Sequence, residues 1–410
     1  MATENNFFTK SRFTFIGEIS YSKKDGGTPL VKGAIKEGSP WSKKALKIGI
    51  VDDDKNVGYP FMEYLYRTKD ATVKLFDSEN KGHDVLIEDL ANQSSIDLVP
   101  EMSRIILDFE EDFELKKEYT KDIYASREIR NKEIITDEDK EKLENHQKNL
   151  KEKAKNRFEV AHMDTAIDIL NKKLPELEGK RVKISGTVNL NYYNENTRLE
   201  YVPNRIEMAQ PNEKSNLTIT SKVFYDENSL TDDEENKRIV INAYFGQKYK
   251  KQEKLYPIQL ILDYNKLDLE NDTHKAMLNF LKSHFDCEDC EAIYNNKFLL
   301  KVINGREKVE FSEECLTEQQ KQAIAFGLNT LDDFRPRGGV YGERIQEIRI
   351  IKPSLTDEYK DGGLIAFSIE ELISHLITSE DDTSDIKKDE VKKEEENTQS
   401  QQNDFMGLFG

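Results

Sequence analysis

The spacing of cysteine and histidine is the first pattern in this chain that could carry chemistry. Cys287 and Cys290 form a C-x-x-C pair, His284 precedes them, and Cys315 follows at a distance. Thiolates and imidazoles are the ligands of structural zinc. A single C-x-x-C without a second close pair is also typical of inert thiols. We therefore expect no metal, with a zinc site at these four residues as the alternative.

Acidic and histidine residues raise the question of catalysis. The run Asp52-Asp53-Asp54 could hold a magnesium ion for a nuclease, but acids in a hairpin loop are usually solvated. His162 shares a predicted helix with Asp164 and Asp168, where their spacing gives a mixed surface face. The sequence has no P-loop, nucleophile elbow or H-E-x-x-H motif. We expect a non-enzymatic protein without a cofactor, with a metal-dependent nuclease as a lesser alternative.

The C-terminal segment combines an acidic run with an apolar end. Ser379 to Asp404 holds ten acids against four lysines, and such a segment buries too little apolar surface to fold. We expect a disordered acidic tail over 379–410 whose tip binds a partner protein. It resembles the tails of bacterial and phage single-stranded DNA-binding proteins, which recruit replication and repair enzymes. The alternative is a solvated tail without a partner. The predicted partner-binding residues are Phe405, Met406, Leu408 and Phe409.

Composition limits the class of protein. The chain has 410 residues, of which 34% are charged and 36% hydrophobic, and its net charge is −18. It has room for two or three domains and no apolar run near the ~20 residues of a membrane span, and its first six residues lack the basic and apolar regions expected of a signal peptide. Three cysteines fit a reducing compartment, so we expect a cytoplasmic protein with no membrane contact. The first 75 residues hold 13 Lys and Arg against nine Asp and Glu, which permits a groove for a polyanion.

Periodicity predicts two β-rich units. Alternating apolar residues and turn signals predict strands at 13–21, 45–51, 57–64, 71–76, 182–192 and 198–208 in the first unit. The second unit has predicted strands at 217–225, 238–245, 255–262, 297–303 and 341–351, with a short helix at 318–331. Residues 112–177 are rich in Glu, Lys, Asn and Leu, which predicts a helical insertion in the first unit.

We therefore expect a β-rich α+β fold of tandem OB-like small barrels, with a helical insertion and a disordered acidic C-terminal tail. The expected boundaries are 1–210 for the first unit with its insertion at about 112–177, 211–378 for the second unit with short helices, and 379–410 for the tail. A pair of open sandwiches is the alternative architecture.

Four segments carry a family resemblance. Phe13-Thr-Phe-Ile-Gly-Glu-Ile-Ser-Tyr, Ser39-Pro-Trp-Ser-Lys-Lys, Arg181-Val-Lys-Ile-Ser-Gly and Gly327-Leu-Asn-Thr-Leu-Asp-Asp-Phe are similar to those of a group of single-stranded DNA-binding proteins from phages of Gram-positive bacteria. The resemblance implies a protein of the host cytoplasm that coats and protects single strands without sequence specificity during phage DNA replication or recombination. It also implies replication or recombination proteins as partners of the tail. The alternative is a non-catalytic interaction or virion structural protein, and the oligomeric state stays open.

That function needs aromatic faces for bases and cations for phosphates. Trp41 is the only tryptophan and lies in a turn-rich segment, which favours a stacking role, although a buried core residue is the alternative. Arg335 and Arg337 flank a proline before two glycines, where a backbone can approach a phosphate. The predicted DNA-binding residues are Tyr21, Lys23, Lys24, Trp41, Lys43, Lys44, Tyr64, Tyr66, Arg67, Tyr192, Tyr193, Arg198, Arg335, Arg337 and Tyr341.

Overall fold

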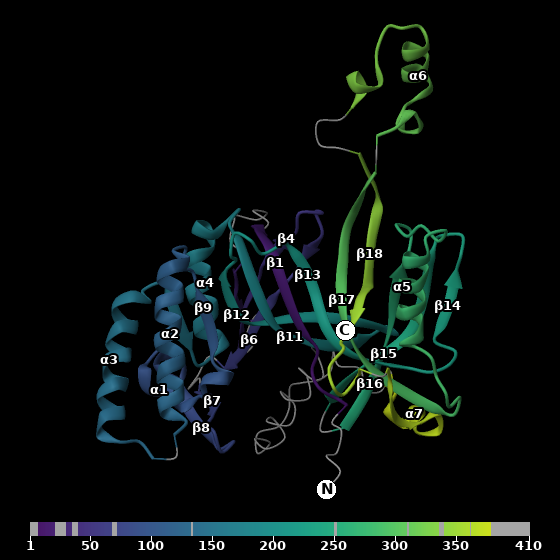
Figure 1. Cartoon of the computed structure of the whole chain (residues 1–410). Coiled ribbons are helices and arrows are strands. Elements are labelled where there is room, and N and C mark those ends of the chain that lie inside the picture. The colour runs from purple at the N-terminus through teal and green to yellow at the C-terminus, as the bar shows by residue number, and fades with distance from the viewer. Residues whose placement is uncertain are drawn as a thin grey trace, which may run out of the picture.

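In the computed structural model of the chain, alternating apolar and polar residues form the strand β1 (Arg12–Ser20), which is central to the fold (Figure 1). Phe13, Phe15 and Ile19 on one face of this strand are 2% exposed or less. The structure describes residues 7–20, 30–34, 40–67, 72–132, 134–249, 252–309, 311–335, 340–360 and 362–378.

Strands of the N-terminal half close into a ring. β1 pairs with β4, β4 with β5, and β3 with β6, all antiparallel. A parallel bridge between Pro60 and Tyr201 then joins this side to β12, and the antiparallel ladders β12–β11 and β11–β1 complete the ring. The remaining bounds are β3 (Trp41–Lys47), β4 (Gly49–Val51), β5 (Val57–Gly58), β6 (Phe61–Arg67), β11 (Arg181–Tyr193) and β12 (Asn196–Met208).

A second ring follows with the same order of pairing. β13 pairs with β15, β15 with β16, β16 with β18 in parallel, β18 with β17, and β17 with β13. Helix α5 (Asp272–Ser283) lies between β16 and β17 of this ring. In the first ring, α4 (Met163–Leu177) lies at the corresponding place, before β11. The strands are β13 (Asn216–Tyr225), β15 (Arg238–Tyr249), β16 (Gln252–Asp263), β17 (Ala292–Val309) and β18 (Val340–Pro353).

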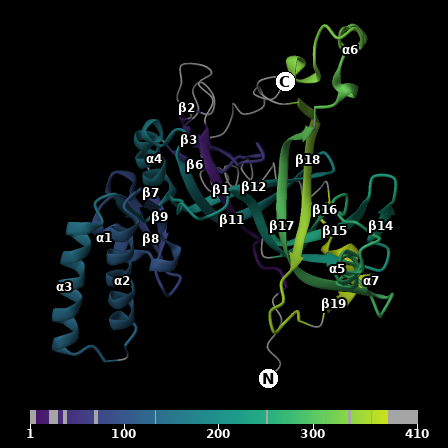
Figure 2. The ribbon, with the colours of Figure 1, turned by 45° about the horizontal axis from the view of Figure 1, so that its top comes forward.

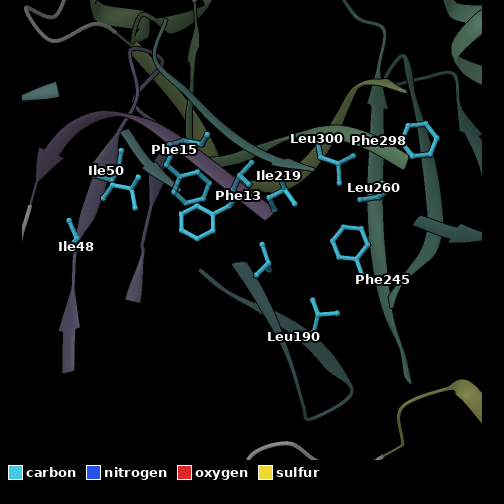
Figure 3. Close-up of a cluster of buried hydrophobic side chains, with 14 of the residues drawn as sticks. Phe13, Phe15, Ile48, Ile50, Leu190, Ile219, Phe245, Leu260, Phe298 and Leu300 are labelled. Atoms are coloured by element: carbon cyan, nitrogen blue, oxygen red, sulfur yellow. The ribbon is translucent and has the colours of Figure 1, made fainter. Parts of the chain in front are cut away.

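One sheet and one core connect the two rings. β1 pairs with β11 on one side and with β13 on the other, so the ladder runs from the first ring into the second. Figure 3 shows buried side chains from both rings in one cluster, with Ile48 and Ile50 at one end, Phe245 and Phe298 at the other, and Phe13 and Phe15 between them. Burial of this continuous apolar surface favours a fixed arrangement of the rings.

Between β6 and α4 the chain forms an inserted unit. It lies on the side of the first ring away from the second, as Figures 1 and 2 show. The helices predicted within 112–177 are present, but β10 separates two of them from α4. The strand predicted at 71–76 belongs to this insertion, where β7 pairs with β8. The elements are β7 (Thr72–Phe76), β8 (Gly82–Leu86), α1 (Gln93–Leu98), β9 (Ile105–Asp108), α2 (Phe113–Arg130), α3 (Asp137–Lys153) and β10 (Arg157–Val160).

Strands β17 and β18 extend beyond the second ring as a two-stranded arm with α6 (Glu318–Ala325) at its end (Figure 1). The remaining elements are β2 (Leu30–Ala34) beside β3, β14 (Leu230–Asp233) beside β15, β19 (Leu364–Ser368) beside β17, and the final helix α7 (Ile369–His375). In the described residues, the strand-rich composition with seven α-helices confirms the expected β-rich α+β class.

Candidate nucleic-acid interface

Trp41 and Arg67 form an aromatic–cation pair across two strands of the first ring. Trp41 begins β3 and lies directly opposite Arg67, the last residue of β6. The guanidinium carbon lies 5.4 Å from the centre of the indole ring, within the range of a cation–π contact. Trp41 is half-buried and Arg67 is exposed, so the pair presents both an aromatic surface and a positive charge to solvent.

Two more pairs of this kind follow on the same face of β3. Alternate residues of β3 point to one face, so Lys43 and Lys47 lie on the same face as Trp41. The Lys43 ammonium lies 5.9 Å from the ring centre of Phe61, and that of Lys47 lies 4.4 Å from the ring centre of Tyr59. Sequence reasoning missed Lys47, Tyr59 and Phe61, although the alternation Trp-x-Lys-x-x-x-Lys signals a shared face. We call the residues of these three pairs the aromatic–cation face.

One carboxylate also contributes to this region. Glu63 on β6 lies 2.5 Å from the Lys43 ammonium and its side chain is only 10% exposed. The side chain of Lys43 is 38% exposed, so part of it remains accessible to a ligand. The ion pair limits how strongly Lys43 can attract a phosphate.

Lys44 lies on the opposite face of β3, which corrects its assignment from sequence. Its side chain is 4% exposed, and its ammonium lies 2.7 Å from a carboxylate oxygen of Asp164 and 2.8 Å from one of Asp168. Burial opposes the charge, but the hydrogen bonds to the two carboxylates raise the pKa of Lys44. Lys44 therefore fixes α4 to β3 and is not available to a phosphate.

Tyr64 and Tyr66 share this opposite face, so the structure separates them from Trp41. Their rings stack with centres 6.0 Å apart, and His162 meets Tyr64 edge-on at 4.5 Å. Tyr64 also packs against the small core of the insertion, and burial raises its pKa. This packing joins the insertion to the first ring, and Tyr64 has a structural role here.

The turn between β11 and β12 carries another exposed aromatic–cation pair. The guanidinium carbon of Arg198 lies 5.4 Å from the ring centre of Tyr193, which is 41% exposed. Tyr192 points to the other side of the hairpin and packs against the main core. The turn itself uses Asn194 and Glu195 with φ of 48° and 60°, a conformation that suits a tight hairpin.

The predicted residues of the arm are only partly described. Arg335 ends the 3-10 helix Leu331–Phe334, its side chain is 58% exposed, and its guanidinium lies 3.2 Å from Asp332. The backbone of Tyr341 lies in β18 opposite Lys308. Arg337, the N-terminal group Tyr21, Lys23 and Lys24, and the tail residues Phe405, Met406, Leu408 and Phe409 lie outside the described residues.

The possible zinc ligands do not come together. The ring nitrogen Nδ1 of His284 lies 2.8 Å from the carbonyl oxygen of Phe280 in its own helical segment. Burial raises the pKa of the Cys287 thiol to about 11, which disfavours a thiolate, and Cys290 is exposed. Cys315 lies in the segment at the end of the arm. Within the described parts of the chain, no group of three or more His, Cys, Asp or Glu side chains is placed to hold a metal ion.

The three consecutive acids at the β4–β5 turn have structural partners. Asp52 is 3% exposed and accepts hydrogen bonds from the backbone and side-chain nitrogens of Asn56 at 2.8 and 3.0 Å. Asp54 lies 2.8 Å from the Lys301 ammonium, which holds the pKa of this carboxyl below its usual range. The backbone nitrogen of Asp53 donates to Ser215 Oγ at 2.7 Å. This turn therefore braces the first ring against the second.

Comparisons with known proteins add little. No protein-family model matches the sequence, and no curated protein matches it significantly. Among the described residues, no helix is both long and apolar enough to cross a membrane. A crystal structure of a deletion mutant of the single-stranded DNA binding protein from Thermus aquaticus aligns over 88% of this chain and 98% of its own, with 6% identity and a TM-score of 0.29. That TM-score is too low for the likeness to bear on the fold or function of this chain.

Proposed function

We propose that the protein binds single-stranded DNA without sequence specificity and without catalysis, using the aromatic–cation face of β3 and β6 as its main platform. The observation that carries this proposal is the row of three pairs, Trp41 with Arg67, Phe61 with Lys43, and Tyr59 with Lys47. Every base offers a π face for stacking and every nucleotide a phosphate for a cation, so such a row binds any sequence. The proposed binding therefore does not depend on the base sequence of the strand.

The strand order supports an OB-type barrel for each ring. In the first ring we count β3 with β4 as the second strand and β5 with β6 as the third, so each ring has five strands. The pairing then runs first, second, third, fifth, fourth and back to the first, with a helix before the fourth strand. OB folds bind oligonucleotides on the face of the second and third strands and on the loops that follow the first and fourth. In the first ring these are the aromatic–cation face, the segment holding Tyr21, Lys23 and Lys24, and the turn of Tyr193 and Arg198.

These rings support the proposed division of the chain into two units. Residues 1–210 form the first OB-like unit, 211–378 the second, and 379–410 the acidic tail. We propose that the protein coats transient single strands during phage DNA replication or recombination in the host cytoplasm. In this role Phe405 and Phe409 dock replication or recombination proteins, and the acids of the tail compete with DNA for the cations of the first unit.

Fluorescence anisotropy tests DNA binding directly. Labelled oligo-dT and a matched duplex are titrated at two salt concentrations while the emission of Trp41 is recorded. The proposal expects tighter binding to the single strand, weaker binding at high salt, and quenching of Trp41 by stacked bases. No binding at low salt would overturn it and leave a protein-interaction role, whereas divalent-metal-dependent loss of the oligonucleotide would indicate a nuclease.

Deletion of 379–410 tests the role of the tail. Removal of its net charge of −6 should strengthen binding to oligo-dT at low salt and abolish capture of partner proteins. A chain truncated only by Asp404–Gly410 keeps nearly all of the acids and serves as the control for the apolar tip. If both truncated chains bind DNA and partners as the full chain does, the proposed role of the tail is wrong.

A further inference from the structure

Two arginines lie directly opposite each other where the arm leaves the second ring. Arg306 of β17 and Arg344 of β18 are partners in the antiparallel ladder, and both are exposed. Side chains at directly opposite positions share one face with their Cβ atoms roughly 5 Å apart. Like charges so placed repel each other and destabilise the ladder. The pairing therefore has a cost in the isolated chain.

Within the described residues, neither guanidinium has a carboxylate partner that would offset this repulsion. Arg344 donates a hydrogen bond to Asn304 Oδ1 at 3.1 Å, which fixes its position without neutralising its charge. A ligand that carries negative charge would offset the repulsion between the two guanidiniums. Guanidinium groups bind phosphate oxygens through two parallel hydrogen bonds, so a phosphate suits this pair.

The location of the pair connects it to the first ring. Asn304, which holds Arg344, donates through Nδ2 to the carbonyl oxygen of Val57 at 2.8 Å. Val57 lies in β5, two residues before Tyr59 of the aromatic–cation face. In addition, the backbone at Gly305 approaches the β4–β5 turn so closely that a Cβ there would lie 3.0 Å from the Lys55 carbonyl oxygen. The arginine pair is thus anchored beside one end of the aromatic–cation face.

We propose that Arg306 and Arg344 form a phosphate clamp that takes the backbone of the single strand as it passes from the first ring to the arm. This inference rests on the proposed function and adds a second, separate binding site to it. Figure 2 shows the arm rising beside the first ring, so a strand that follows β3 and β6 meets the arm near its base. The clamp reads a phosphate and contributes no base preference.

The test compares two variants with the same change in charge. The double variant R306Q and R344Q removes the clamp, and the double variant K117Q and K142Q removes two exposed lysines from α2 and α3 of the insertion. Each is titrated with oligo-dT over a range of salt concentrations. The clamp variant should show a slope of log K against log salt that is smaller by about 0.7, because the clamp contacts one phosphate and each phosphate contact contributes about 0.7 on a single strand. The control should keep the slope of the unchanged chain.

A third variant separates binding from folding. R306E places a carboxylate opposite Arg344, so the repulsion becomes an ion pair and the Tm without DNA should not fall, while affinity for oligo-dT should drop by about tenfold or more. If the clamp variant and the lysine control have equal slopes while the unchanged chain binds DNA, the clamp is wrong and the proposed function stands. If the unchanged chain does not bind oligo-dT, the proposed function itself fails.

Discussion

At the scale of single residues, side-chain direction decides which residues are accessible to a ligand. Trp41 and Lys44 are three positions apart on one strand, yet one is part of the aromatic–cation face and the other is enclosed by Asp164 and Asp168. Successive residues of a strand point to opposite faces, so neighbours in sequence can have unrelated roles. Binding should therefore respond to Trp41 and not to every aromatic–cation pair.

Replacement of Trp41 by alanine tests this expectation. Stacking on an aromatic side chain is worth about 1–3 kcal/mol per base, so W41A should weaken oligo-dT binding by at least about fivefold. Tyr124 of α2 provides a matched control, because it is 60% exposed and lies 6.0 Å from Arg127 in a similar pair on the insertion. Anisotropy titration of W41A and Y124A measures the difference. Equal affinities for the two variants would contradict the proposed role of the aromatic–cation face in binding DNA.

His162 predicts how stability depends on pH. Burial lowers its pKa to about 4, and its Nδ1 accepts a hydrogen bond from the backbone nitrogen of Asp164 at the start of α4. The unfolded chain takes up the proton near pH 6.5, so the folded state loses stability as the pH falls from about 6.5 toward 4. The stabilisation that neutral, buried His162 contributes is fully present above pH 6.5. Protonation would also remove the acceptor that caps the helix.

The variant H162N should flatten this part of the pH profile. Asparagine is a good N-cap and does not titrate, so the difference in Tm between pH 7 and pH 5 should shrink by roughly 2 °C or more. Thermal unfolding followed by circular dichroism at both pH values measures it. Since other carboxylates titrate in both proteins, only the difference between the two profiles counts. Parallel profiles would show that His162 does not contribute.

At the scale of elements, close backbone contacts set where strands can pair. Gly186 lies at a register shift in the β11–β12 ladder, and a Cβ there would lie 2.0 Å from the Val202 carbonyl oxygen and 2.8 Å from Pro203 Cα. Both atoms belong to the backbone, so the strands would have to move apart. Glycine at this position lets β11 and β12 cross closely and close the first ring.

Substitution of Gly186 by alanine should therefore destabilise the protein by about 2 kcal/mol or more, as overpacking in a fixed core does. Gly179 is the control, because its φ is +76° but nothing lies within 4 Å of a Cβ. G179A has only the cost of a left-handed backbone, about 1–2 kcal/mol. Urea denaturation ranks the two variants. A smaller loss for G186A than for G179A would show that the strands can relax.

At the scale of the whole molecule, the two rings share a sheet and a core. The ladder from β11 through β1 to β13 crosses between them, and Asp54 with Lys301 braces the outer contact. We expect the rings to unfold together. Trp41 fluorescence reports on the first ring and far-UV circular dichroism on the whole chain, so their urea transitions should coincide. Two separate transitions would show that the rings are independent.

Elements with strong local signals were predictable. The alternation in β1, the Asp112 cap that accepts from the backbone nitrogens of Glu114 and Leu115, and the Thr136 capping box all determine structure through residues a few positions apart. The five strands predicted for the second unit appear near the predicted positions, and the helix predicted at 318–331 corresponds to α6 on the arm. Helix α5 was not predicted. Local propensity and periodicity act over these short separations, so sequence alone carries them.

Other features depend on contacts between distant segments. The pairing of Trp41 with Arg67 requires the register of β3 and β6, and the burial of Lys44 requires Asp164, 120 positions later. The sequence pattern at 71–76 is the same as that of a strand in the rings, but this strand, β7, pairs with β8 in the insertion. The sequence by itself determined the elements with strong local signals and the types of residue that we propose to bind DNA. Only the tertiary structure decided which faces meet solvent, because period-two alternation does not state which face a distant helix will cover.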